Sequence, residues 1–404
     1  MFKGLIQNEF IKLFSKKKTY IILGLFIILM VGFFFISESD EKWFIKTNSH
    51  EYQIESLERE IEWAENDIKY IKEDINLKES EKKSEIKIQE ERVMNLKDQI
   101  KFSKEEYLKT KDLTNKEKIA LEIKELKKMK ADAEGAESKN YFDGEINRLN
   151  IYLENNIPID SLRMNNSISY LILSFTAIGV GFLAFGLILF NSDIVTGEYN
   201  PGTLKFLLIQ PVTRIKVLLS KFLVAVVSSI SLIIGVQILA AIVVGFIKGF
   251  GSLSIPVLAN QKFEFIFEDG IRQISSISGS GYFISMTSFL LKSFVLQALF
   301  ITAMVSFIFL VSVIFQSTVV SMTVLIATLL GSNIIHSLSG TYRKISPFIF
   351  LHLTNAESII SGNIIQETEF MQAGFTSSVI VLVSTTILLL TASLYIFKKR
   401  DILI

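Results

Sequence analysis

Six apolar stretches and one long charged stretch follow one another along this chain. Each apolar stretch is close to the roughly 20 residues that a helix needs to cross a bilayer. The six stretches are Tyr20–Ile36, Ile168–Phe190, Val217–Phe246, Ser293–Phe315, Thr318–Ile335 and Thr376–Phe397. The pattern therefore predicts an all-α membrane protein with six transmembrane helices and a long polar insertion after the first.

A basic, amphipathic segment precedes the first apolar stretch. Its apolar residues are spaced to share one helical face, and they are Phe2, Leu5, Ile6, Phe10, Leu13 and Phe14. We expect residues 1–18 to form an interfacial helix, which is either a docking element for a cytoplasmic partner or a simple anchor. No small-x-small cleavage site follows Ile36, so residues 19–36 are expected to remain as transmembrane helix 1.

Three polar residues border or interrupt the apolar stretches. Lys292 borders the fourth stretch, where its ammonium group can reach the interface, and this placement is favoured over a functional charge inside the membrane. Gln237 and Gln297 lie within the third and fourth stretches. Each either bonds to a neighbouring helix or lines a path, and the bond between helices is the simpler explanation.

The charged stretch, residues 41–160, holds 23 Lys and Arg residues against 29 Asp and Glu residues. Its first part repeats apolar residues at steps of three and four, as a coiled coil does. These residues are Ile54, Leu57, Ile61, Ala64, Ile68, Ile71 and Ile75. The repeat then breaks over the highly charged residues 78–92.

A return helix is indicated by a second apolar set. This set is Ile119, Ile123, Leu126, Phe142, Ile146, Leu149 and Leu153. Thr114 and Glu117 have the spacing of a capping box, so a helix is expected to restart at Glu117. We predict that residues 41–160 form an extracytoplasmic antiparallel helical hairpin, a coiled-coil arm that reaches about 90 Å if it is straight for some 60 residues. A bend or a second tip near residues 78–92 would shorten this reach.

Lysine and arginine beside the spans predict the orientation, because positive residues resist translocation. Most of them fall before the first span, near the loop between spans two and three, and after the last span. They are Lys3, Lys12, Lys16, Lys17, Lys18, Lys205, Arg214, Lys216, Lys221, Lys398, Lys399 and Arg400. Both termini and the loop 191–216 are then cytoplasmic, whereas the arm and residues 248–291 and 336–375 face outward.

The loop between spans two and three has the composition of a structured elbow. Pro201 and Gly202 indicate a turn. Thr203 can cap a short helix over residues 204–210, and Pro211 ends it, because the residue before a proline is pushed away from helical geometry.

This elbow resembles that of the type-2 ABC exporter permeases, with an acidic residue, G-T-L, a leucine pair and P-x-[ST]-R. The matching residues are Glu198, Gly202, Thr203, Leu204, Leu207, Leu208, Pro211, Thr213 and Arg214. Lys221 is placed like a lysine that often begins the next span in this family. The resemblance covers about residues 1–36 and 167–404, and the long arm departs from the usual pattern.

The resemblance implies a transmembrane subunit that works with several partners. Its elbow would be a coupling helix seated in a separate cytoplasmic ABC ATPase subunit, which binds ATP and Mg²⁺, while this chain itself holds no cofactor. A second permease, identical or related, would complete a dimer within the membrane lipid. The outward segment 336–375 would re-enter the membrane, with Ser346, Pro347 and Phe348 at an outer gate.

The remaining sequence excludes several chemistries. The chain has no cysteine, and its three histidines, His50, His336 and His352, are far apart in sequence, so neither a disulfide nor a zinc site is expected. No Walker motif is present and the dipeptide Gly-Lys is absent, so ATP hydrolysis is expected on another chain. We expect no catalytic or metal-binding residues and no nucleic-acid partner.

Two functional hypotheses follow for a chain in the bacterial plasma membrane. The first is the permease subunit of an ABC exporter that moves a hydrophobic or peptide-like substrate. The second is a mechanical or sensory protein, in which the ATPase moves the arm to regulate a cell-wall or signalling partner. The arm itself is either a solvated surface or a contact for an extracytoplasmic partner. A purely structural anchor gives no reason for six spans and an elbow.

Overall fold

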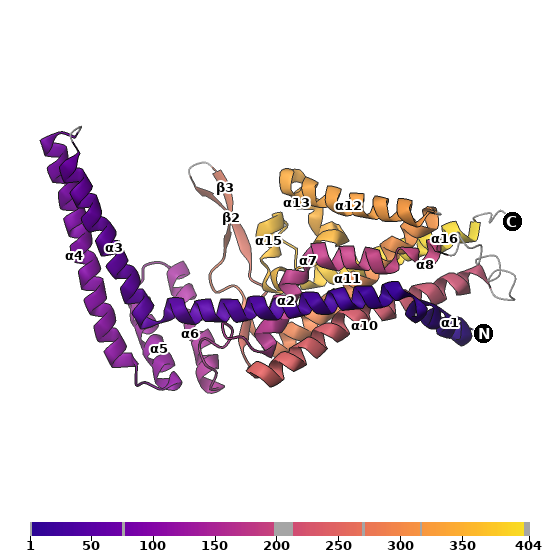
Figure 1. Cartoon of the computed structure of the whole chain (residues 1–404), viewed down its shortest axis with the longest axis horizontal. Coiled ribbons are helices and arrows are strands. Elements are labelled where there is room, and N and C mark those ends of the chain that lie inside the picture. The colour runs from indigo at the N-terminus through magenta and orange to yellow at the C-terminus, as the bar shows by residue number, and fades with distance from the viewer. Residues whose placement is uncertain (1, 75–76, 198–212, 269–270, 316, 400–404) are drawn as a thin grey trace.

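The computed structural model describes residues 2–74, 77–197, 213–268, 271–315 and 317–399. This part of the chain is elongated and mostly helical (Figure 1). The long apolar helices fill one end, the charged arm forms the other, and both chain termini lie at the end far from the arm. The arm and the spans are therefore separate layers along the long axis.

Five described helices are long and apolar enough to cross a membrane. They are α2 (Lys17–Asn48), α10 (Arg214–Lys248), α11 (Met286–Ile314), α12 (Thr318–Leu338) and α16 (Phe375–Lys399). A sixth candidate is a bent pair within α7 (Ser167–Asn191) and α8 (Asp193–Thr196), broken by 70° next to Gly179. Gly179 has φ 35° and ψ −162°, which glycine adopts readily because it lacks Cβ. The six predicted apolar stretches all lie in helices, and the count of six spans requires the bent pair to be one span.

Helix α11 is the centre of the membrane bundle. In its most apolar window 61% of the residues are buried, against 11–28% in the other four long helices. It packs against α16, α10 and α7, and its Phe309 and Phe294 rings meet Phe222 and Phe175 edge to face. A helix that is apolar all round is expected to be buried, which explains the position of α11.

The N-terminal helix α1 (Phe2–Ser15) forms as predicted from its amphipathic pattern. It packs against α10 and buries Leu5 and Leu13, while Ile11 and Phe14 on its other side are exposed. Its position at the membrane interface stays a prediction, to which the exposed apolar residues are suited.

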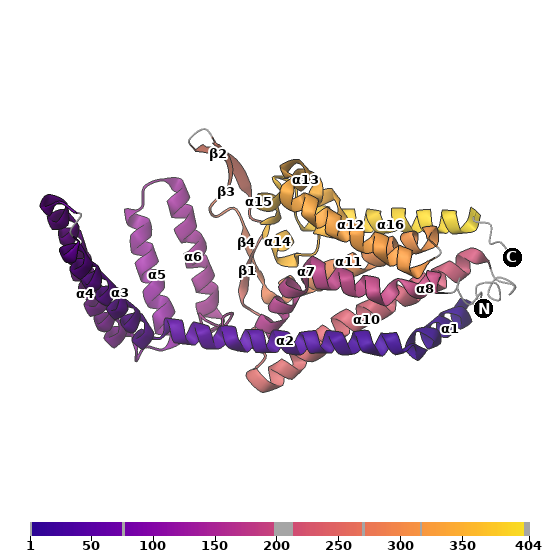
Figure 2. The same cartoon turned by 45° about the horizontal axis from the view of Figure 1, so that its top comes forward.

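The arm consists of two helical hairpins rather than one (Figure 2). Its helices are α3 (His50–Glu73), α4 (Glu79–Thr110), α5 (Asn115–Asp132) and α6 (Ala136–Glu154). Helix α3 pairs with α4, and α5 pairs with α6. Of the two alternatives for residues 78–92, a bend or a second tip, the structure has a second tip. It lies between the end of α3 and the start of α4, and α4 includes most of residues 78–92. The longest arm helix has 32 residues and spans about 48 Å, half of the 90 Å reach predicted for a straight hairpin.

We predicted that the first apolar repeat would pack against a single return helix, but each repeat packs within its own hairpin. In the first hairpin Ala64 of α3 is buried, as are Val93 and Leu96 of α4. The second apolar set is divided between two helices, so α5 and α6 bury their apolar residues against each other. The break after α5 comes at residues 133–135, where Gly135 has φ 86°.

The predicted capping box is confirmed, although α5 begins at Asn115, two residues before the predicted start at Glu117. The Thr114 hydroxyl accepts a hydrogen bond from the Glu117 backbone N–H at 3.4 Å, and a Glu117 carboxylate oxygen accepts one from the Thr114 N–H at 2.8 Å. This reciprocal capping box satisfies backbone donors at the helix N-terminus. It also holds the pKa of Glu117 below its usual value, mainly through the hydrogen bonds from Thr114.

The prediction of an all-α fold is wrong between α10 and α11. Four short strands form there as two antiparallel pairs, β1 (Pro256–Ala259) with β4 (Tyr282–Ser285), and β2 (Phe263–Glu268) with β3 (Ile271–Ser276). The registers pair Pro256 with Ser285 and Phe263 with Ser276. The strands project beside the spans on the side of the arm (Figures 1 and 2).

A series of short helices connects α12 to α16. They are α13 (Gly340–Ile345), η1 (Ser346–Phe348), η2 (Phe350–His352), α14 (Ala356–Ser361) and α15 (Ile364–Thr368). The turn after β1 docks on them, because the Asn260 and Gln261 N–H groups donate to the carbonyls of Ile360 and Ser361 at 2.9 and 2.7 Å. Gly362 is required at this contact, since a Cβ there would lie 2.5 Å from the Gln261 carbonyl oxygen.

Candidate coupling region and its surroundings

Most of the predicted coupling residues fall in the elbow itself. Glu198, Gly202, Thr203, Leu204, Leu207, Leu208 and Pro211 lie outside the described residues. Thr213 has an extended backbone and precedes α10, and Arg214 is the first residue of that helix. The description of the region therefore rests on the two segments that flank the elbow, α8 before it and α10 after it.

Asp193, at the start of α8, is held by two lysines from the junction of α1 and α2. The Lys16 ammonium lies 3.0 Å from one Asp193 carboxylate oxygen, and Lys18 pairs with the other. At the other end of α8, the Thr196 and Thr318 hydroxyls are 2.8 Å apart. The segment before the elbow is thus bound both to the N-terminal helices and to the start of α12.

The segment after the elbow is bound to the N-terminal helix by a buried ion pair. Lys221 of α10 and Glu9 of α1 approach to 2.9 Å, with side chains only 2% and 8% exposed. Lys12 lies 3.6 Å from the same carboxylate. Sequence reasoning singled out Lys221 but missed Glu9, although an acidic residue within the apolar face of an amphipathic helix was a signal for a buried partner.

A second polar cluster joins three helices at the end of the bundle that faces the arm. The Lys248 ammonium lies 2.5 Å from Glu38 and 3.3 Å from Glu41, both on α2. The backbone N–H of Asn165, just before α7, donates to Glu41 at 3.0 Å, and the Ser37 hydroxyl donates to the Asn165 side chain at 2.9 Å. This cluster therefore joins α2, the start of α7 and the end of α10.

The polar residues within the spans have distinct surroundings. Lys292 lies over the ring of Phe375, 5.5 Å from its centre. Gln237 donates from its amide nitrogen to the Ser174 hydroxyl at 3.4 Å, which is the predicted bond between helices. The amide oxygens of Gln237 and Gln297 are buried, and neither has a hydrogen-bond partner in the described part of the chain. For Gln297 a role in lining a path stays open.

The predicted gate residues form one short 3₁₀ helix, η1. Ser346 and Pro347 are buried, and the Ser346 hydroxyl donates to the Arg343 carbonyl at 2.7 Å. Phe348 is exposed, and its ring meets Phe370 edge to face with centres 4.9 Å apart. The re-entrant position and gating role of this segment stay predictions.

Two of the three histidines, which are far apart in sequence, lie together at the C-terminal end of α12. The rings of His336 and His352 stack with centres 4.4 Å apart. The Ser332 hydroxyl lies 3.0 Å from His352 Nε2 and 2.7 Å from the Tyr342 hydroxyl. Burial, together with the nearby charge of His336, lowers the pKa of His352 to about 4. Within the described residues no group of three or more metal-ligating side chains is found.

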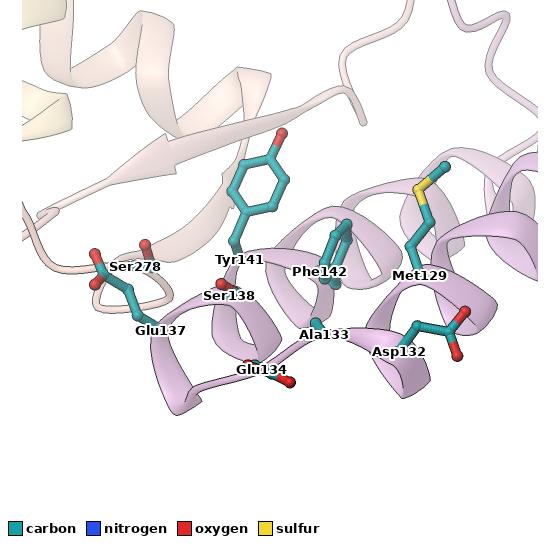
Figure 3. A pocket seen from close by; sticks show the side chains of 9 residues that line it. All are labelled: Met129, Asp132, Ala133, Glu134, Glu137, Ser138, Tyr141, Phe142 and Ser278. Atoms are coloured by element: carbon teal, nitrogen blue, oxygen red, sulfur yellow. The ribbon is translucent and has the colours of Figure 1, made fainter.

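An open acidic pocket of about 580 Å³ lies between the arm and the loop that follows β3 (Figure 3). The turn between α5 and α6 contributes the carboxylates of Asp132, Glu134 and Glu137, and Ser278 follows β3 on the other side. The rings of Tyr141 and Phe142 line the same pocket. The second hairpin is thus in contact with the strand region between α10 and α11.

The apolar helices and the flanking contacts define a multi-pass membrane protein. Comparison with protein families places it further: the family described as ABC-2 family transporter protein matches residues 5–402. The match covers nearly the whole chain, so the chain belongs to the ABC-2 family of transporter proteins, and the resemblance predicted from the elbow is confirmed. A search of curated proteins found no match to this chain. This family comprises membrane subunits for transport that are not themselves catalytic.

Proposed function

We propose that this chain is the permease subunit of an ATP-driven exporter, coupled through residues 198–214 to a separate ATP-binding subunit. Membership of the ABC-2 family over residues 5–402 carries the proposal. The ion pairs of Asp193 and Lys221, on either side of the elbow, support it. Apolar helices enter a bilayer without such ion pairs, so the two pairs are better explained by a role in holding the elbow in place.

The flanking contacts suit the elbow to transmit movement. Helix α10 runs unbroken from Arg214 to Lys248, a length of about 52 Å, so a displacement at its first residue moves its far end. On the other side of the elbow, a displacement of α8 is passed to α2 by the ion pairs of Asp193 with Lys16 and Lys18. The far ends of α2 and α10 are joined by Lys248, so both helices move together.

The membrane body suits a dimeric exporter with both termini cytoplasmic. Large apolar residues are exposed along the long helices, where they face either lipid or a second permease. The exported substrate is hydrophobic or peptide-like, in keeping with spans that contain few charged residues. The lysine-rich ends of the spans lie on the cytoplasmic side.

A double variant of the elbow tests the proposal. Glu198→Ala with Arg214→Ala is expected to reduce assembly with the ATPase and coupled export, because it removes polar contacts to the partner, while membrane insertion stays intact. The matched control is Glu264→Ala with Arg272→Ala, which removes the same charges from the outward strands. Normal assembly and export by the correctly inserted elbow variant would overturn the proposed coupling role.

A second candidate function is mechanical transmission to the arm, with nothing crossing the membrane. The observation that favours it is the continuity of α2, a helix of 32 residues that ends one residue before α3. Movement of α2 at Lys17 is thereby delivered to the first hairpin. Replacing residues 50–155 with a short Gly-Ser linker separates the two functions. An exporter retains substrate-stimulated ATP hydrolysis in its complex, whereas a transmitter loses every cellular output.

A further inference from the structure

A cavity of about 600 Å³ lies between α2, α7 and α10. Its lining is almost wholly apolar and includes Leu25 and Leu29 of α2, Phe182 of α7 and Leu232 of α10. All three elements lie within the candidate spans, so the cavity is at membrane depth. Its size falls in the range of about 300–1,000 Å³ typical of ligand pockets.

Glycines on α7 create this cavity. Gly181 and Gly186 both line it, and a Cβ added to either would meet no heavy atom within 4 Å. The bend at Gly179 also turns this half of α7 relative to the first half. The cavity is open at the surface of the spans, because Leu25 and Phe182 in its lining are 58% and 61% exposed. The walls of an unfilled groove lose dispersion contacts. An apolar occupant restores those contacts.

The polar end of the cavity is already satisfied. Ser229 is the hydroxyl residue of the lining, and its oxygen accepts a hydrogen bond from the Asn191 side chain at 3.0 Å. Asn191 also donates to the Leu187 carbonyl at 3.0 Å. An occupant therefore needs no polar group inside the cavity, which is the chemistry of an aliphatic chain.

Positive charge lies at the end of α2 from which the cavity lining begins. Lys18, Ile22, Leu25 and Leu29 fall on one stripe of α2, and the last three line the cavity. Three consecutive lysines, Lys16–Lys18, stand at this end, and Asp193 pairs with the first and the third. The Lys17 side chain is exposed. Such basic segments attract anionic headgroups by about 1 kcal/mol per lysine.

We propose that this cavity binds one acyl chain of an anionic phospholipid, whose headgroup phosphate lies at Lys17. The lipid comes from the leaflet on the lysine-rich side of the membrane. In a bilayer an acyl chain gains no hydrophobic energy by moving onto a protein. Selectivity therefore rests on the shape of the groove and on the headgroup charge. The proposal depends on the membrane position of the spans and not on coupling to an ATPase.

The acyl-chain contact is tested by photolabelling the full-length chain in nanodiscs. The probe is phosphatidylglycerol with a diazirine midway along one acyl chain, and the labelled residues are mapped by mass spectrometry. In the wild type, label is expected to concentrate on α2, α7 and α10 around the cavity. Gly186→Leu fills the cavity and is expected to reduce that label at least fivefold. A label spread evenly over the exposed faces of all spans would overturn the proposal.

Two further variants keep this test decisive. Gly235→Leu is the matched control, because Gly235 lies on α10 outside the lining and also has open space around its Cβ position. It is expected to leave the label unchanged. Gly181→Leu replaces Gly186→Leu should the latter fail to fold, as judged by its melting profile. If neither filling variant lowers the label more than Gly235→Leu does, the cavity is not the binding site.

The headgroup contact is tested by changing the charge of the probe. Phosphatidylcholine with the same diazirine chain is expected to label the cavity several-fold less than phosphatidylglycerol. Lys17→Gln is expected to abolish this preference while the chain continues to insert normally. Equal labelling by both lipids in the wild type would overturn the assignment to an anionic phospholipid.

Discussion

Glu9 and Lys221 are 212 positions apart in the sequence and form an ion pair of 2.9 Å between α1 and α10, both side chains almost fully buried. A buried charge that loses its partner is costly, because the low-dielectric surroundings do not solvate it. The pair therefore fixes the amphipathic helix to the span that begins at the elbow, and it does so with a specific geometry rather than by apolar contact alone.

Removing the Glu9 carboxylate is expected to destabilise the protein strongly. Glu9→Leu leaves the Lys221 ammonium buried without this carboxylate, and the expected loss is about 3–5 kcal/mol. Replacing both residues, as Glu9→Leu with Lys221→Met, is expected to recover most of the loss, because well-packed apolar residues often substitute for a buried pair. Unfolding of the purified chain, followed in detergent, measures both effects.

An exposed ion pair provides the control for this prediction. Arg59 and Glu55 are 2.8 Å apart on the surface of α3, four residues from each other. Exposed pairs contribute about 0.2–1 kcal/mol, so Glu55→Leu is expected to cost less than 1 kcal/mol. A loss for Glu9→Leu as small as that for Glu55→Leu would show that the buried pair does not hold α1 in place.

Acidification is expected to destabilise the segment around His352. Burial and the nearby charge of His336 lower the pKa of His352 from 6.5 to about 4. The unfolded chain thus binds a proton between these two pKa values that the folded chain does not. The stability contributed by neutral His352 is complete above pH 6.5 and is lost as the pH falls towards 4.

Thermal unfolding at pH 7.5 and pH 5 measures this dependence. Because His352 is only half-buried, we expect a loss of roughly 1 kcal/mol at pH 5. His352→Gln is expected to remove this part of the pH dependence. His50→Gln, in the arm, is the matched control and is expected to retain it. Equal pH dependence in all three proteins would assign the effect to other groups.

The sequence predicted the helices best where a pattern was long and local. The apolar stretches and the capping box of Thr114 and Glu117 depend on residues close in sequence, and they were found at the predicted places. The two hairpins of the arm were ambiguous because the same seam spacing permits different helix pairings. The strand β2 was missed although Phe263 and Phe265 alternate with Glu264, a period that indicates a strand.

The surroundings of the candidate site were less predictable than the helices. Sequence reasoning identified the elbow by its family resemblance, but the ion pairs beside it join residues from helices far apart in the chain. Asp193 and Lys16 meet only because α8 lies beside the junction of α1 and α2. The cavity depends likewise on the bend at Gly179, which no single-residue pattern specifies.

Gln297 offers a way to separate a structural role from a role in transport. Its amide oxygen is buried and has no hydrogen-bond partner in the described part of the chain, and such a group costs about 1–3 kcal/mol. Gln297→Met keeps a similar volume and removes this oxygen, so we expect stability to rise by about 1 kcal/mol. Gln237→Met is the comparison, because it also removes the bond to Ser174.

Export by the same variants decides between the two roles of Gln297. We expect the Gln297→Met variant to insert into the membrane normally and to melt at a higher temperature than the Gln237→Met variant. If the amide lines the substrate path, transport falls although stability rises. If transport and stability both stay at or above wild-type values, Gln297 has no role in the path.

The first hairpin of the arm depends on close packing at Ala64. This side chain is fully buried where α3 faces α4, so Ala64→Leu adds atoms to a space that is already filled. Overpacking typically costs about 1–3 kcal/mol, and we expect the pair to open more often. Hydrogen exchange in α3 and α4 should therefore accelerate, while exchange in α10 and α11 stays unchanged.

Ala120→Leu, at an exposed position of α5, makes the same change without the packing conflict and is expected to have no effect. Equal exchange in both variants would mean that α3 and α4 do not pack at Ala64, and the arm would then lack the rigidity that mechanical transmission requires.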